Sequence, residues 1–228
     1  MFSIARAPER AQPTNDEVGR NGQAVESPIL GAFVPDPEIR ALTGRLEQLL
    51  ASRRPVKLFV TACSPGEGAT TVAQSLANAL AIDGRQVLHC TSTAGAAGIT
   101  AICRAAAEPG ERPIHSTSIA SLHVVDISDL QRAEVNAGAV TAFRNWLEAL
   151  PSWLDVIVVD MPPALVRQSW LSIAGMPDGI ILVVEAEHTR SMVLRTTAKT
   201  LQHAGGHILG IVFNKRRRHI PHLVYRWL

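Results

Sequence analysis

Hydrophobic residues in this chain form short unbroken runs separated by segments with a different spacing. Six runs are separated in this way: "VKLFVTAC" (56–63), "QVLHC" (86–90), "LHVVDI" (122–127), "DVIVVD" (155–160), "GIILVVEA" (179–186) and "ILGIVFN" (208–214). Strands that are apolar throughout are buried on both faces, which is typical of a parallel sheet covered by helices on each side. The pattern therefore predicts an α/β fold with a mostly parallel sheet.

The segments between the runs carry apolar residues at helical spacing. Residues 70–82, about 136–149 and 189–203 each place them three or four positions apart, as on one face of a helix. A capping residue and a first-turn proline precede a further amphipathic helix over about 37–52. The stretch 92–118 is rich in Ala and Gly, and we expect a helix and a loop there.

Composition divides the chain into three parts. Residues 1–35 are rich in Pro, Gly, Asn, Glu and Arg without lasting periodicity, which indicates a flexible N-terminal tail. Residues 36–214 form the predicted domain. Residues 215–228, "KRRRHIPHLVYRWL", are a basic and aromatic C-terminal tail. A charge run is usually a solvated surface, but the aromatic and aliphatic residues favour docking on a partner's cytoplasmic surface or on anionic lipid.

Charge and cysteine usage narrow the classes of function. The net charge of the 228 residues is +2, too small to indicate a nucleic-acid partner. Three cysteines without metal-type spacing suit a reducing cytosol. The first residues lack the apolar core of a signal peptide, and no apolar run reaches the roughly 20 residues of a membrane helix. We expect a cytoplasmic protein that is peripheral at the inner membrane through a partner.

The segment "CSPGEGATT" (63–71) has the form of a phosphate-binding loop between the first strand and a helix. Glycines let the backbone wrap an anion, and N–H groups at the helix N-terminus point at it. In the pattern G-x-x-x-x-G-K-[ST], Gly68 is the second glycine and Thr70 the hydroxyl on the metal side. Cys63 stands at the first glycine and Ala69 at the lysine. A glycine-rich turn that serves packing alone is the alternative.

A second motif is the apolar strand in "LDVIVVDMPP", which ends in Asp160. An acid at the end of a buried strand orients the water shell of Mg²⁺ in phosphate-loop proteins, although a strand-end Asp can also cap the next segment. We predict Asp160 as the catalytic acid and, with Thr70, as the site of Mg²⁺. The expected ligand is ATP or ADP, bound by the loop residues Pro65, Gly66, Glu67, Gly68, Ala69, Thr70 and Thr71.

Together, the motifs resemble the bacterial tyrosine kinase family. The resemblance rests on "VTACSPGEGATT", "LDVIVVDMPPAL", "PDGIILVVEAEHTR" and "LGIVFNK" in this order, and it covers about residues 38–214. It implies a P-loop NTPase-like fold, and it implies a membrane polysaccharide copolymerase as the partner, since the family works with these proteins in capsule and exopolysaccharide export. It also implies that Asn214 contacts the adenine base, although a polar strand terminus is an equal alternative. The broader group contains ATPases of the Min and Par types.

This chain departs from the family at several positions. Ala69 stands where the family has its loop lysine, and Thr91 and Thr93 in "HCTSTAG" stand where it has acids that support Mg²⁺ and the attacking hydroxyl. Tyr225 is the sole tyrosine, in place of the family's tyrosine-rich cluster. The motif that makes family members oligomerise is recognisable only in part, around Glu38, Arg40 and Arg45.

These departures predict a pseudo-kinase, in which the fold and the partner surfaces are kept and phosphoryl transfer is weak or absent. The resemblance then implies an accessory protein of exopolysaccharide synthesis or export, which can also form a homo-oligomer. One alternative is an active autokinase or ATPase that uses Lys199, or an arginine from a neighbouring subunit, in place of the missing lysine. Another is a positioning protein of the Min or Par type.

Overall fold

The computed structural model describes residues 46–52, 54–91, 114–128, 137–166 and 168–215. Predictions about both tails, about the start of the first helix and about residues 92–113 of the Ala/Gly-rich stretch lie outside these residues. The same holds for the predictions about the Glu38, Arg40 and Arg45 motif, about Thr93 and about Tyr225.

A seven-stranded sheet forms the centre of the molecule, in the order β3-β4-β2-β5-β1-β6-β7. Its strands are β1 (Val56–Ala62), β2 (Val87–Thr91), β3 (His115–Ser116), β4 (Leu122–Asp126), β5 (Val156–Asp160), β6 (Gly179–Glu185) and β7 (Ile208–Asn214). All pairings are parallel except that of β3 with β4. The prediction of an α/β fold with a mostly parallel sheet and helices on both faces is confirmed.

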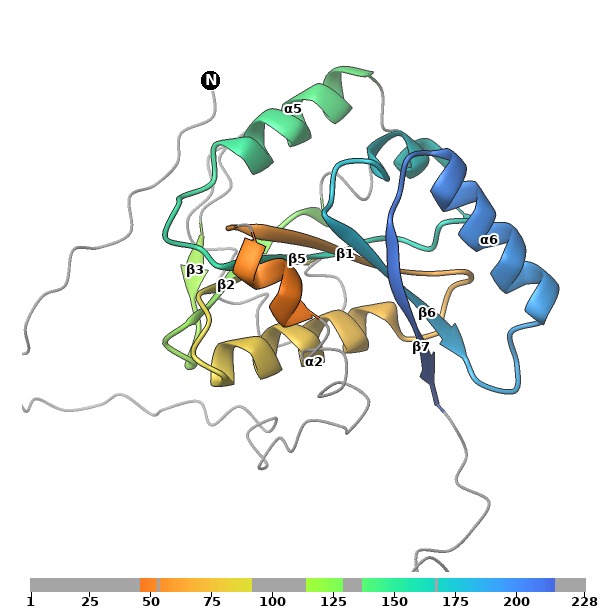
Figure 1. Ribbon diagram of the computed structural model, residues 1–228, viewed down its shortest axis with the longest axis horizontal. Helices are drawn as coiled ribbons and strands as arrows, with labels where there is room; N and C mark the ends of the chain where they lie inside the picture. The colour runs from red at the N-terminus through yellow and green to blue at the C-terminus, as the bar shows by residue number, and fades with distance from the viewer. Residues whose placement is uncertain (1–45, 53, 92–113, 129–136, 167, 216–228) are drawn as a thin grey trace, which may run out of the picture.

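Helices cover both faces of the sheet (Figure 1). The helix over residues 46–52 and α2 (Ala69–Ile82) lie on one face. On the other face lie α5 (Ala137–Glu148), the 3-10 helix η2 (Gln168–Ile173) and α6 (Ser191–His203). Each helix presents an apolar stripe to strands that are apolar on both sides, so the sheet is buried between two layers.

Two hydrophobic clusters correspond to the two faces. On the α2 face, Leu46 and Leu50 pack with Leu76 and Leu80 of α2 against residues of the sheet. The small side chains of α2, such as Ala73 and Ala77, are fully buried. A helix with alanine on its inner face can lie close to the sheet.

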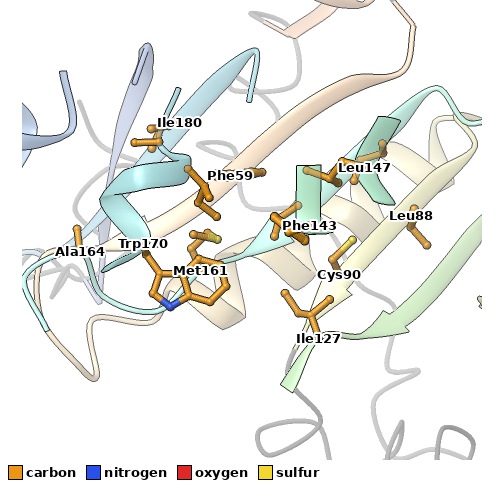
Figure 2. Packing of buried hydrophobic residues seen from close by; sticks show 14 of the residues in the cluster. Phe59, Leu88, Cys90, Ile127, Phe143, Leu147, Met161, Ala164, Trp170 and Ile180 are labelled. Atoms are coloured by element: carbon orange, nitrogen blue, oxygen red, sulfur yellow. The ribbon is translucent and has the colours of Figure 1, made fainter. Parts of the chain in front are cut away.

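Aromatic residues build the opposite cluster (Figure 2). Phe143 of α5 lies between Phe59 of β1 and Trp170 of η2, with ring centroids 6.4 Å from each. It also stacks on Trp146, at a centroid distance of 5.8 Å. Tilted and offset arrangements of this kind are the favoured geometries of aromatic pairs. Figure 2 shows Met161, which follows β5, beside Trp170.

Two elements differ from the sequence prediction. Residues 114–116 fall in a stretch for which a helix and a loop were expected, but His115 and Ser116 form β3 by antiparallel pairing with β4. The 3-10 helix η2 was not predicted. A two-residue polar strand has no hydrophobic period, and η2 is too short for one, so packing against the rest of the fold decides both.

No helix in the described parts of the chain is both long and apolar enough to cross a membrane.

Candidate functional site

The candidate site lies at the edge of the sheet where the parallel strands end, called here the carboxyl edge. β1 pairs with β5 on one side and β6 on the other, so the loop after β1 begins between the ends of these strands. β2 pairs with β5 in a register that places Cys90 opposite Val159, and Thr91 and Asp160 follow. The topology thus brings together motifs that lie far apart in sequence.

The backbone of the loop has the shape expected for anion binding. Gly66 and Gly68 have φ values of 84° and 94°, a region that residues with a Cβ rarely adopt. Gly68 is the N-cap of α2, and no side chain caps the helix there. The N–H groups of the first turn of α2 therefore remain available to an anion at the helix N-terminus.

Glu67 turns into the protein rather than out of the loop. Glu67 is only 4% exposed to solvent. One carboxylate oxygen accepts hydrogen bonds from the N–H groups of Cys63, at 2.8 Å, and Ser64, at 3.0 Å. The other accepts a hydrogen bond from the hydroxyl of Thr189, at 2.5 Å. The carboxylate therefore fastens the base of the loop to the turn that follows β6.

Asn214, at the end of β7, fastens the same loop from another side. Its Nδ2 donates a hydrogen bond to the carbonyl oxygen of Glu67 at 2.9 Å. It also lies so close to Gly68 that a Cβ at that position would overlap it. Gly68 is therefore required both by its backbone conformation and by the side chain of Asn214.

Asp160 meets two threonine hydroxyls at the carboxyl edge. The hydroxyl of Thr91 donates a hydrogen bond to its Oδ2 at 3.4 Å, and the side chain of Thr70 also bonds to the carboxylate. Asp160 is 4% exposed. Burial raises the pKa of its carboxyl from 3.8 to about 6, and the two threonine hydrogen bonds act in the opposite direction. The structure thus brings Thr70, Thr91 and Asp160 together. The sequence motifs point to Thr70 and Asp160, and the resemblance points to Thr91.

The remaining loop residues differ in exposure. Pro65, Gly66, Thr70 and Thr71 are exposed at the surface of the edge. Ala69 is the first residue of α2, and its methyl group belongs to the cluster beneath that helix. No charged group therefore extends from position 69.

A curated protein matches most of the chain. The sequence is 26% identical over 171 residues to the tyrosine-protein kinase CpsD of Streptococcus agalactiae serotype III (strain NEM316). The match covers 69% of this chain and 73% of CpsD. No family model matches the chain.

The chain is therefore similar in sequence to a bacterial tyrosine kinase. Its fold is shared with the kinase domain of the Escherichia coli tyrosine kinase ETK, with a TM-score of 0.59, 17% identity and coverage of 81% and 78% of the two chains. The chimerical protein CapA2B2 has a TM-score of 0.61 and 19% identity, and the match covers 86% of this chain and 88% of that one. A putative plasmid partition protein of Borrelia burgdorferi B31, solved bound to AMPPNP, has a TM-score of 0.52 and 17% identity, with coverage of 77% and 83%.

Three cationic side chains of the kinase-like protein bear on the missing loop lysine. Lys199 is the substitute that the sequence suggested, and Arg190 and Lys215 lie at the start of α6 and directly after β7. Lys199 is exposed and lies eight residues after the first residue of α6, roughly 12 Å along the helix. Arg190 is the exposed N-cap residue of α6. Lys215 pairs with Glu185, with 3.0 Å between Nζ and a carboxylate oxygen. None of these contacts places a cation on the loop itself.

Sequence reasoning missed the part that Thr189 plays in the site of the kinase-like protein. Its hydroxyl links the N–H of Glu185 to the carboxylate of Glu67, 122 residues earlier in the chain. Nothing in the short sequence "HTR" indicates this contact, because it depends on the pairing of β6 with β1. Cys63, which stands at the first glycine position of the loop pattern, is fully buried, and burial raises the pKa of its thiol.

Proposed function

We propose that this kinase-like protein binds a nucleotide without efficient phosphoryl transfer and acts as an accessory of exopolysaccharide or capsule synthesis. In this proposal its partner is a membrane polysaccharide copolymerase. The relation to CpsD, a tyrosine-protein kinase, supports the choice of system. The AMPPNP bound to the partition protein of similar fold supports the choice of ligand.

One observation carries the proposal. The buried carboxylate of Asp160 is bonded to Thr91, at the position where the resemblance expects an acid, while Ala69 occupies the position of the lysine. Phosphoryl transfer depends on positioned positive charge and metal. Loss of one such group costs about 3 to 4 kcal/mol of transition-state stabilisation, by analogy with an oxyanion-hole donor. The geometry of the edge therefore persists without the charges that would make it a kinase site.

The residues that remain suit binding. Backbone N–H groups of the loop and of α2, with Thr70 and Thr71, would contact the phosphates. Thr70 and Asp160 supply oxygen donors, the type that Mg²⁺ prefers, and a cation beside the buried carboxylate would offset the cost of its burial. When bound, Mg²⁺ would neutralise phosphate charge. Asn214 reaches the loop from β7, where the resemblance expects a contact to adenine.

A phosphorylation assay tests the catalytic part. We expect the purified full chain to form no phosphotyrosine at Tyr225 with ATP and Mg²⁺, because the loop lacks its cation. CpsD under the same conditions is the positive control, and the doubly substituted variant Ala69→Lys/Thr91→Asp shows whether restoring both charges restores transfer. Robust phosphorylation of Tyr225 in the unmodified chain would overturn the pseudo-kinase proposal and favour the active autokinase.

A membrane-association assay tests the partner. The full chain and a chain that ends at Lys215 are mixed with membranes from cells with and without a polysaccharide copolymerase, and the bound fraction is measured after flotation. We expect binding that needs both the copolymerase and residues 216–228, because that segment combines arginines with aromatic residues. Binding that does not need the copolymerase points instead to anionic lipid, and equal binding of the two chains removes the tail from the proposal.

A further inference from the structure

The phosphate loop has lost a cation and kept an anion. In "CSPGEGATT" (63–71) Glu67 is the one charged residue, so the formal charge of the segment is −1. A lysine at position 69 would bring it to zero. The change from lysine to alanine therefore alters the electrostatics of the whole loop as well as removing one contact.

The carboxylate of Glu67 is stabilised by hydrogen-bond dipoles, which leave its net charge in place. Its carboxylate accepts hydrogen bonds from two backbone N–H groups and one hydroxyl, those of Cys63, Ser64 and Thr189. None of the ion pairs within the described segments includes Glu67. A charge buried in this way is weakly screened by solvent, and it acts on any anion that enters the loop.

The phosphates of a nucleotide would meet different surroundings in this loop. Backbone N–H groups of a phosphate loop hold the α- and β-phosphates, whereas the lysine reaches the β- and γ-phosphates. Gly66, Gly68 and the uncapped start of α2 preserve the first set of groups. The methyl group of Ala69 removes the second. A γ-phosphate would thus gain little from the loop and would add negative charge near Glu67 and Asp160.

We propose that the loop selects a nucleoside diphosphate over the corresponding triphosphate. This inference rests on the nucleotide binding proposed above and concerns which nucleotide occupies the site. A diphosphate uses the backbone cradle fully and carries one negative charge fewer past the carboxylates. In the absence of Mg²⁺, ADP should bind at least tenfold more tightly than ATP, and Mg²⁺ should reduce this ratio because it neutralises part of the triphosphate.

Calorimetric titration of the full chain with ADP and ATP, first in EDTA and then with Mg²⁺, measures this ratio. The variant Ala69→Lys returns a cation to the start of α2. It should raise the affinity for ATP more than that for ADP, so that the ADP preference in EDTA falls by at least fivefold. A merely structural effect of the substitution would change both affinities together.

A second variant acts on the anion. Glu67→Gln removes the charge and keeps the shape and one acceptor oxygen, so it should also raise the affinity for ATP more than that for ADP. Its control is Asp83→Asn, which removes the same charge at the other end of α2, roughly 20 Å away, and should leave the ratio unchanged. Thermal unfolding shows whether each variant is folded. If only one of Ala69→Lys and Glu67→Gln folds, that variant alone still tests whether the loop charge sets the ADP preference.

The outcomes separate the two proposals. If neither nucleotide binds to the unmodified chain or to Ala69→Lys, the proposed function itself is wrong. If both bind and ATP binds as tightly as ADP in EDTA, nucleotide binding stands and the selectivity is overturned. A preference for ADP that neither folded variant reduces also contradicts the inference, because the loop charge would then not be its cause.

Discussion

Asp160 is an acid that the fold buries beside two hydroxyls at the end of β5. Its pKa is raised to about 6 chiefly by burial, so the ionised form is less stable in the folded protein than in the unfolded chain. A residue that lowers stability in this way is typical of a functional site. This cost is consistent with a role for the acid in binding a cation.

Replacing this acid should stabilise the protein at alkaline pH. A rise from 3.8 to about 6 corresponds to about 3 kcal/mol above pH 6, a cost that disappears below the unfolded pKa. We expect Asp160→Asn to raise the free energy of unfolding at pH 8 by about 1–3 kcal/mol, and the gain should shrink towards pH 4. Urea unfolding of both proteins at the two pH values measures it. A gain that does not depend on pH would show that the carboxylate charge is not responsible.

His89 should have the opposite dependence on pH. It is fully buried in β2, its Nε2 has no hydrogen-bond partner within the described residues, and burial lowers its pKa from 6.5 to about 4. Its contribution to stability is therefore complete above pH 6.5 and is lost as the pH falls towards 4. Between pH 7 and pH 5 this loss amounts to about 2 kcal/mol.

The variant His89→Leu isolates that contribution, because Asp160 is the same in both proteins. We expect the free energy of unfolding of the variant to fall less than that of the unmodified chain when the pH is lowered from 7 to 5. Denaturant unfolding at the two pH values decides the matter. Equal changes in the two proteins would mean that His89 does not titrate differently in the folded and unfolded chains.

At the residue scale, the sequence motifs led us to expect Thr70 and Asp160 at one edge of the sheet, because the ends of parallel strands meet there, and the resemblance pointed to Thr91. The structure brings these three side chains together. The inward turn of Glu67 does not follow from the sequence, since loop side chains are generally expected to be exposed. It depends on two backbone N–H groups of the same loop and on Thr189, which only the folded chain brings to its carboxylate.

At the scale of elements, the loop and β7 act as one unit. Gly66 and Gly68 both have positive φ values, but a Cβ on Gly66 would meet no atom within 4 Å, whereas a Cβ on Gly68 would overlap the amide of Asn214. Replacing Gly66 therefore tests backbone strain alone, whereas replacing Gly68 tests backbone strain together with a steric contact between the loop and β7.

We expect Gly66→Ala to lower the free energy of unfolding by about 1 kcal/mol, the cost of a left-handed alanine. Gly68→Ala should cost roughly 1–2 kcal/mol more, because Asn214 must also move. In an Asn214→Ala background this excess should vanish, since the overlapping amide is gone. Denaturant unfolding of the two glycine variants, each with and without Asn214→Ala, and of Asn214→Ala alone gives the comparison. An excess that persists without Asn214 would contradict it.

The helices and strands were predictable where the hydrophobic pattern continued over many residues. Six apolar runs became six strands of the sheet, with ends shifted by one residue at most, and α2, α5 and α6 appeared at their expected places. His115 and Ser116 of β3 could not be predicted, because their strand exists only through pairing with β4. The same reason applies to η2, whose buried Trp170 packs against Phe143 of α5.

At the scale of the whole molecule, the strand order places the loop near the middle of the sheet, between β5 and β6. The apolar strands predict a parallel sheet, but their order in space does not follow from their order along the chain. That order is seen only in the folded protein.

The hydrogen bond from Asn214 to Glu67 joins residues that are 147 positions apart in the sequence. The ribosome makes Glu67 early and Asn214 among the final residues of the domain. The nascent chain therefore lacks this contact until β7 has emerged and paired with β6. A protein cut short before β7 would carry the loop motif in its sequence, but the hydrogen bond from Asn214 that fastens the loop could not form.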